Sequence, residues 1–223
     1  MLITAMAVMC LSLFGCRTRT EIRANVGDII TFGAYEQDND TSNGKEDIEW
    51  IVLEKEDDRI LVISRYALDI QKYNTSRTGV TWETCSLRKW LNETFLNDAF
   101  SKRERAMIPS VSVSADMNPY SSISPGNSTT DQVFLLSSTE ADKYFSTDSR
   151  CLCQGPADCL AKGNYKTDND NVHWWLRPPG THYFAAAAVT HHPSILYGYI
   201  SYSGADVDRP IAVRPALWIN LGS

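Results

Sequence analysis

The chain has 223 residues, of which 43% are hydrophobic and 22% are charged, a composition typical of one globular domain of ordinary size. Its net charge of -6 argues against a nucleic-acid partner, because phosphate binding needs clustered lysine and arginine. No apolar run reaches 18 residues, so the sequence predicts no ordinary transmembrane helix.

The N-terminus is apolar from Met1 to Gly15 and then becomes polar. This length is typical of the apolar region of a secretory signal peptide. Cys16 follows Gly15, with Leu13 three positions before it, which resembles a bacterial lipobox whose cysteine is lipidated. We expect a signal peptide over residues 1–15, lipidation at Cys16, a linker over 16–25 and a lipid-anchored location at the cell envelope or surface. Bulky Phe14 and the absence of a preceding lysine or arginine leave a plain signal peptide or a buried helix as alternatives.

Four cysteines remain beyond the lipobox, and three of them lie in the loop 151–159, which glycine and proline interrupt. An exported protein meets an oxidising compartment, which favours one or two disulfides or free thiols. A zinc site is disfavoured, because the spacing C-x-C-x5-C lacks the usual C-x2-C element. The four cysteines are Cys85, Cys151, Cys153 and Cys159.

The first part of the domain predicts strands at residues 26–33, 48–54 and 59–65, with a turn at Asn43-Gly44 between the first two. The intervening loop partly matches an EF-hand calcium loop. The required glycine is one place late, however, and Glu49 belongs to the next strand, so a solvated hairpin loop is the preferred interpretation. The partial match places Asp38, Asp40, Ser42 and Glu49 at ligand positions 1, 3, 5 and 12.

The middle of the chain predicts helices. Residues 81–96 carry apolar side chains at helical spacing, including Trp90, which we expect in the core rather than in a binding site. Capping boxes at residues 101–104 and 137–140 predict two further helix starts. Residues 110–137 between them predict a strand, a long polar loop and another strand.

The chain ends with the motifs "VHWWLRPPG" and "VRPALWINL". Together with "GDIITFG", "IEWIVLE", "SLRKWLN" and "VFLLS", they resemble a bacterial family of exported domains with a C-type lectin-like fold of the formylglycine-generating-enzyme variety. The resemblance implies an α+β domain over residues 26–223, with short helices packed on small antiparallel sheets. It also implies a central buried strand at residues 213–219, with Leu217 and Trp218 on opposite faces.

Similar domains are the variable proteins of diversity-generating retroelements, in which a C-terminal cassette is randomised at adenines. When the adenines of an asparagine codon are randomised and its third base stays a pyrimidine, the new codon cannot encode Lys, Glu, Gln, Trp or Met. Those five types total 33 in this chain, and all except Trp218 lie within residues 1–177. Residues 178–217 contain none, which predicts a variable cassette there. A buried β-segment that lacks long polar side chains is the alternative explanation.

A cassette at residues 178–217 would place its alanines, histidines, proline and tyrosines at exposed positions. Val189, Gly198, Gly204 and Val207 would form its fixed frame. Tyrosine offers a large contact area at low entropic cost, which suits a binding surface. A zinc site at His191 and His192 is disfavoured, because neighbours on a strand point to opposite faces. The candidate ligand-binding residues are His182, Tyr183, Phe184, His191, His192, Tyr197, Tyr199, Tyr202, Asp206, Asp208 and Arg209.

These features favour a surface-displayed protein that binds a protein or another surface ligand, with no cofactor or metal and no membrane contact beyond the lipid anchor. An enzyme of the formylglycine-generating type is one alternative, but its chemistry uses a late cysteine pair and no cysteine follows Cys159. Other catalytic motifs such as G-x-S-x-G and H-E-x-x-H are absent from the sequence. The second alternative is an invariant carbohydrate-binding envelope protein, for which "TDNDN" at residues 167–171 is the candidate site.

Overall fold

The computed structural model describes residues 24–145, 151–162, 170–191 and 198–221. The first of its two five-stranded sheets has the order β1-β2-β3-β14-β7. Its strands are β1 (Ile29–Tyr35), β2 (Glu46–Lys55), β3 (Arg59–Ser64), β7 (Val133–Phe134) and β14 (Ala216–Asn220). All neighbouring strands are antiparallel. The β-branched residues of β3 are fully buried, which is the environment such side chains favour in a central strand.

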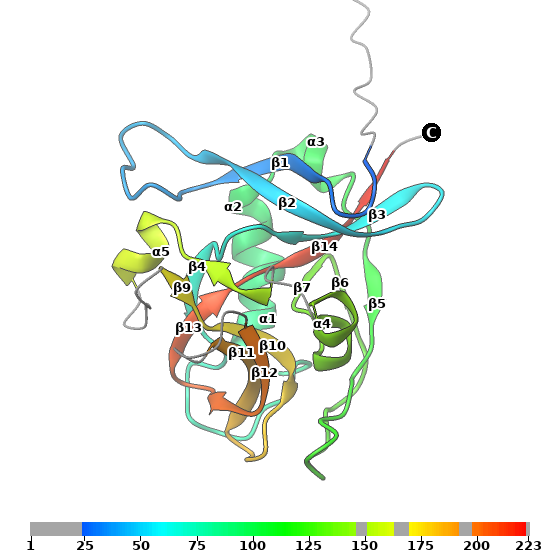
Figure 1. The fold of residues 1–223 in the computed structure, drawn as a ribbon, viewed down its shortest axis with the longest axis vertical. Helices are drawn as coiled ribbons and strands as arrows, with labels where there is room; N and C mark the ends of the chain where they lie inside the picture. Colours follow the sequence, from blue (N-terminus) through cyan, green and yellow to red (C-terminus); the bar gives the residue numbers. More distant parts are fainter. Residues whose placement is uncertain (1–23, 146–150, 163–169, 192–197, 222–223) are drawn as a thin grey trace, which may run out of the picture.

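The second sheet has the order β12-β11-β10-β13-β4 and lies below the first in Figure 1. Its strands are β4 (Asp69–Lys72), β10 (Trp174–Pro179), β11 (Ala185–His191), β12 (Gly198–Asp206) and β13 (Pro210–Val213). Only the pair β10–β13 is parallel. Two short ladders complete the β-structure, β5 (Val111–Val113) with β6 (Thr129–Asp131) and β8 (Cys153–Gln154) with β9 (Asn171–Val172).

The helices are short. The two capping boxes start helices as predicted, the helix expected over residues 81–96 begins at Ser86, and the last helix is not predicted from the sequence. Residues 86–99 form one continuous helical segment made of α1 (Ser86–Trp90), the π-helical turn η1 (Leu91–Phe95) and α2 (Leu96–Ala99). The capping boxes at Ser101 and Ser137 start α3 (Lys102–Arg105) and α4 (Ser138–Phe145), with hydrogen bonds in both directions. The last helix is α5 (Ala157–Lys162). Trp90 is half-buried and packs against the core.

The predicted strand 213–219 is divided between the two sheets. β13 ends at Val213 in the second sheet, and β14 begins at Ala216 in the first. Between them the fully buried Arg214 donates from Nε to the carbonyl oxygen of Ser64 (2.8 Å) and lies over the Trp174 ring. Within β14, Leu217 is buried, whereas Trp218 is half-buried beneath the Arg59 guanidinium. The expected central buried strand is present as β14 between β3 and β7, but it begins at Ala216 rather than at Val213, and the residues before it join the two sheets.

The expected fold class is wrong. Strands account for 39% of the described residues and helices for only 18%, so the domain is mainly β rather than α+β, and nothing in the sheet arrangement supports a C-type lectin-like fold. In the part of the chain that the structure describes, the longest continuous helical segment is residues 86–99, and every other helix has at most eight residues.

Candidate functional site

Three segments that are distant in sequence meet at one end of the molecule. They are the loop 114–128, the turn 180–184 between β10 and β11, and strand β12, and they lie at the lower end of Figure 1, opposite the described end of the chain at Ala24. We refer to their outward side chains as the end surface. Its members are Met117, Tyr120, His182, Tyr183, Phe184 and Tyr202.

Buried Arg177 fixes the start of the loop 114–128. Its guanidinium donates to both carboxylate oxygens of Glu140 in α4, at 2.6 and 3.0 Å. It also donates to the carboxylate of Asp116 (3.2 Å) and to the carbonyl oxygen of Ser114 (3.0 Å). The planar guanidinium binds several acceptors at once in a fixed geometry. Arg177 therefore connects the start of the loop 114–128 to β10 and to α4.

Asn118 fixes the next part of the loop against β12. It is 1% exposed, and its side-chain amide donates to the carbonyl oxygens of Pro179 (3.0 Å) and Tyr202 (2.7 Å). The side-chain oxygen Oδ1 of Asn118 accepts from the backbone N–H of Tyr120 (2.9 Å). The rings of Tyr120 and Tyr202 then meet edge-on, with centroids 4.8 Å apart, an arrangement that aromatic pairs favour.

The turn 180–184 carries a second group of aromatic side chains. The rings of His182 and Phe184 stack with centroids 6.0 Å apart. The Arg77 guanidinium lies 4.4 Å from the Phe184 ring centroid and forms an ion pair with Asp206 (2.8 Å). An exposed ion pair adds little stability, so the main effect of Arg77 is to hold Phe184 and Asp206 together.

The structure places the sequence-predicted site residues as follows. Among those whose side chains it describes, none is buried: His182, Tyr183, Tyr199 and Arg209 are exposed, and Phe184, Tyr202, Asp206 and Asp208 are half-buried. The backbone of His191 ends β11. Cys16, His192 and Tyr197 lie outside the described residues, as do residues 167–169 of the "TDNDN" segment.

Not all of these residues share one face. Tyr199 is paired with Thr190, and Ile200 with Val189. Because side chains alternate along a strand, Tyr199 and Tyr202 point to opposite faces of β12. The expectation of exposed alanines is wrong, since Ala185–Ala188 are at most 3% exposed between β10 and β12. Val189 and Val207 are buried as well, as a fixed frame requires.

Sequence reasoning missed Arg77, Met117, Asn118 and Tyr120. Met117 is 58% exposed and Tyr120 is 72% exposed, values that approach the 74% of Tyr183. Asn118 is separated by 84 residues from Tyr202, whose carbonyl oxygen it binds. The loop has no periodic pattern, so no local signal in the sequence relates it to β12.

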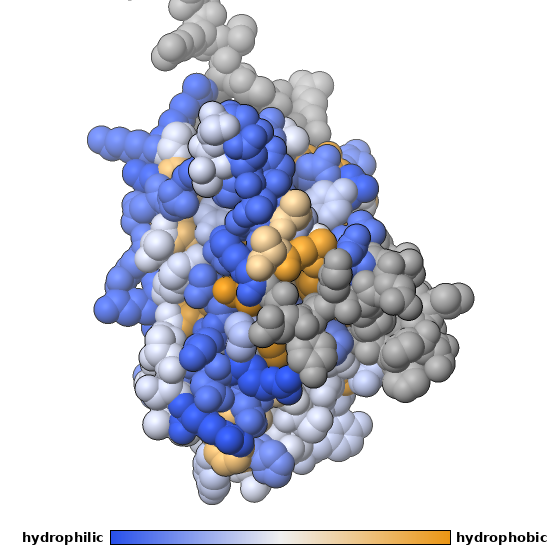
Figure 2. All heavy atoms as spheres, turned by 90° about the vertical axis from the view of Figure 1, so that its left-hand side faces the viewer, coloured by the Kyte–Doolittle hydropathy of each residue, from blue (hydrophilic) through white to orange (hydrophobic). Residues whose placement is uncertain are grey.

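A pocket of about 160 Å³ opens in the second sheet, away from these aromatic side chains. Most of its lining is aliphatic, but Thr190, His173 and Arg209 contribute polar groups. On the side of the molecule that carries β13 and α5, Figure 2 shows a small hydrophobic area with hydrophilic surface on its left. The pocket is lined by Ile70, Val172, His173, Ala188, Thr190, Gly204, Ala205, Arg209, Pro210, Ile211 and Ala212.

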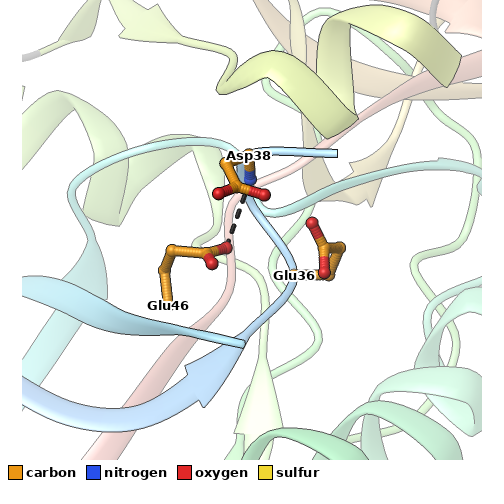
Figure 3. A group of neighbouring side chains, drawn as sticks. All are labelled: Glu36, Asp38 and Glu46. Carbon is orange, nitrogen blue, oxygen red and sulfur yellow. Dashed lines mark hydrogen bonds between the residues drawn. The ribbon is translucent and has the colours of Figure 1, made fainter. Parts of the chain in front are cut away.

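Three carboxylates gather in the loop between β1 and β2 (Figure 3). Oxygen atoms of Glu36, Asp38 and Glu46 lie within 4.8 Å of one another. Partial dehydration and the charge of Glu46 raise the pKa of Glu36. Glu46 accepts the backbone N–H of Asp38 (3.2 Å), and both other carboxylates accept the N–H of Asp40. Oxygen ligands of this kind suit Ca²⁺ or Mg²⁺, but these hydrogen bonds account for the cluster without an ion.

The partial EF-hand match does not describe this loop. Asp40 accepts from the hydroxyl of Ser42 (2.6 Å), and Glu49 forms an ion pair with Arg65 (2.9 Å) from within β2. The loop joins two antiparallel strands, so the hairpin interpretation is confirmed.

Cys85, Cys153 and Cys159 carry free thiols, and all four described cysteines are buried. Burial raises the pKa of the Cys85 and Cys159 thiols to about 12 and also raises that of Cys153. A thiol with a raised pKa and no solvent access is a poor nucleophile. These cysteines therefore act as small core residues.

The fold and the candidate sites define a mainly β domain with aromatic side chains exposed at one end and a small pocket in its second sheet. The chain belongs to a family described as a domain of unknown function (DUF6273), whose sequence model matches residues 57–221. No curated protein and no solved structure matches the chain. Within the described residues, no helix has both the length and the apolar character needed to cross a membrane.

Proposed function

We propose that this protein is an exported binding module that contacts a protein ligand through the end surface. The observation that carries this proposal is the exposure of Tyr120 and Tyr183, 72% and 74%, at one end of the molecule. Large aromatic side chains are costly to expose to water, whereas they are the preferred anchors of protein interfaces. Buried Arg177 and Asn118 hold the segments that carry them, so little conformational entropy would be lost on binding.

The orientation of the domain supports this proposal. The described chain begins, in dark blue, at the end opposite the end surface (Figure 1). We propose that residues 1–15 are a signal peptide and that Cys16 is lipidated. A lipid anchor so close to Ala24 would direct the end surface away from the membrane, where a ligand can reach it.

We further propose that only the exposed positions within residues 178–217 are diversified by a retroelement. Buried positions such as Ala187, Val207 and Leu217 pack in the core, where randomised side chains would leave cavities or clashes. Among the residues of this range whose side chains the structure describes, the exposed positions are His182, Tyr183, Tyr199, Ser203, Arg209 and Pro210. The absence of Lys, Glu, Gln, Trp and Met from residues 178–217 is the observation that supports diversification.

The binding proposal is tested by site-specific photocrosslinking of the full chain in intact cells of its own organism. A benzophenone amino acid replaces Tyr120 or Tyr183 in separate variants. The control is Lys89 in α1, whose side chain is similarly exposed at 72% and lies outside the end surface. We expect Tyr120 and Tyr183 to give one shared protein adduct and Lys89 to give none. Absence of the adduct, or equal labelling from Lys89, contradicts the proposal.

The diversification proposal has a separate test in the neighbouring DNA. We expect a reverse transcriptase gene and a near-copy of the coding region for residues 178–217. Differences between the copy and the gene should fall on adenines of the copy and on codons for exposed residues. A locus without such a copy contradicts diversification and leaves the binding proposal intact.

A further inference from the structure

The pocket in the second sheet is separate from the end surface, and none of the six residues of that surface lines it. We propose that this pocket is a binding site for a phenolic ring, the chemistry shared by small phenols and by the side chain of tyrosine. The inference does not rest on the proposed function, because it depends on other residues and on a different ligand.

The size of the pocket selects a single ring. Its volume is about 160 Å³, and a cavity of roughly 150 Å³ lined by aliphatic side chains holds one benzene molecule. Drug-sized and cofactor-sized ligands need pockets of roughly 300 Å³ or more. The pocket therefore fits a six-membered ring with one or two small substituents and excludes nucleotides and larger cofactors.

The shape and the lining favour a flat, apolar ligand. Ile70 and Ile211 provide aliphatic walls, and the small residues Ala188, Gly204 and Ala205 leave space between the strands. Gly204 is held at a φ of +72°, and a Cβ atom there would lie 2.0 Å from the carbonyl oxygen of Ala186. The backbone at this side of the pocket is therefore restricted to glycine, which keeps the space open.

One buried polar atom favours a ligand whose ring carries a hydroxyl group. Thr190 lines the pocket, and its Oγ1 atom is buried without a hydrogen-bond partner among the described residues. Such an orphaned hydroxyl is uncommon in native proteins, because burial removes its hydrogen bonds to water. A threonine hydroxyl can donate one hydrogen bond and accept others, so it complements a phenol, which does the same.

The competing ligand is a small aromatic acid, since Arg209 and His173 also line the pocket. Both side chains already have interaction partners within the protein. The net charge of -6 also disfavours an anion. Thr190 has no such partner, so the geometry points to the phenol rather than to the acid.

The experiment measures dissociation constants by NMR titration of the full 223-residue chain with p-cresol, toluene and benzoate. We expect p-cresol to bind more tightly than either of the others. Thr190→Val removes the hydroxyl at nearly constant volume, so it should weaken p-cresol binding by roughly two- to tenfold and leave toluene binding unchanged. Ala205→Leu should weaken both ligands, because the larger side chain fills the pocket.

A tripeptide with a central tyrosine distinguishes the two sources of the ring. Binding of the tripeptide at the same resonances indicates a tyrosine of a protein partner, and binding of p-cresol alone indicates a free phenol. The proposal is overturned if benzoate binds most tightly, if Thr190→Val affects p-cresol and toluene equally, or if no ligand perturbs the pocket. Tyr183→Ala should leave p-cresol binding unchanged, which separates failure at this pocket from failure at the end surface.

Discussion

Replacement of Arg177 by methionine removes the centre of the most connected polar network that the structure describes. The Arg177 side chain is 2% exposed and donates to Glu140, to Asp116 and to the carbonyl oxygens of Ser114 and Leu135. Methionine has a similar length but donates no hydrogen bond. The substitution therefore removes the charged donor of two partly buried carboxylates and of two carbonyl groups. Glu140 keeps only the backbone N–H of Ser137, and Asp116 the hydroxyl of Ser114, among the hydrogen bonds described.

The expected cost follows from these contacts. Removing one partner of a buried ion pair costs about 3–5 kcal/mol, because the remaining charge loses its compensation. Glu140 is 32% exposed and Asp116 is 27% exposed, so water recovers part of that loss. We expect Arg177→Met to lower the free energy of unfolding by about 3 kcal/mol, toward the lower end of this range. For a domain of this size that corresponds to a decrease in Tm of about 6–12 °C.

Urea unfolding followed by tryptophan fluorescence measures this change. Arg177→Lys keeps the charge but not the fork of donors, and it should fall between the wild type and Arg177→Met. Arg103→Met is the matched control, because Arg103 is exposed in α3, and it should change the free energy of unfolding by less than about 0.5 kcal/mol. A loss below about 1 kcal/mol for Arg177→Met would show that the network does not hold the loop 114–128.

Three further predictions concern the backbone, the thiols and the end surface. Gly204→Ala should lower the free energy of unfolding by more than about 3 kcal/mol, because its Cβ atom would lie 2.0 Å from a carbonyl oxygen of β11. Gly44→Ala, where nothing lies within 4 Å, should cost only about 1 kcal/mol in the same urea titration. Between pH 9 and 12 the free energy of unfolding should fall, because the thiols of Cys85 and Cys159 ionise near 9 in the unfolded chain but have a pKa of about 12 when folded. Alkaline urea titrations check this, and an unchanged slope in Cys85→Ala and Cys159→Ala would contradict it. Tyr183→Ala should change Tm by less than about 2 °C, since the side chain is 74% exposed. A decrease in Tm as large as that of a core substitution, measured by calorimetry, would show that Tyr183 is packed in the core and is not part of the end surface.

Local features of the fold could be predicted from the sequence. Strands β1, β2 and β3 and the capping boxes at Ser101 and Ser137 depend on neighbouring residues, and the structure has all of them. Propensity and capping act within a few residues, so their signals are visible without knowledge of the fold.

Features that depend on distant contacts could not be predicted. The sequence predicts a strand for the segment that contains Arg214, yet Arg214 and Pro215 lie between the two sheets, where the Arg214 guanidinium donates to the carbonyl oxygen of Ser64, 150 residues away. Ala185–Ala188 carry no charge and no bulk, so the sequence alone does not distinguish a variable surface from a strand buried between two others. At the end surface, the position of Tyr120 depends on Asn118 and Arg177, whose hydrogen bonds to Pro179, Tyr202 and Asp116 join separate parts of the chain.

The position of β14 has a consequence for the synthesis of the protein. β14 lies between β3 and β7 in the first sheet and comes after every other strand along the chain. During translation, β1, β2 and β3 emerge early, but β3 has no partner on its other side until Asn220 has left the ribosome. A chain truncated before Ala216 would retain two unpaired strand edges, on β3 and on β7, which favours its aggregation or degradation over completion of the fold.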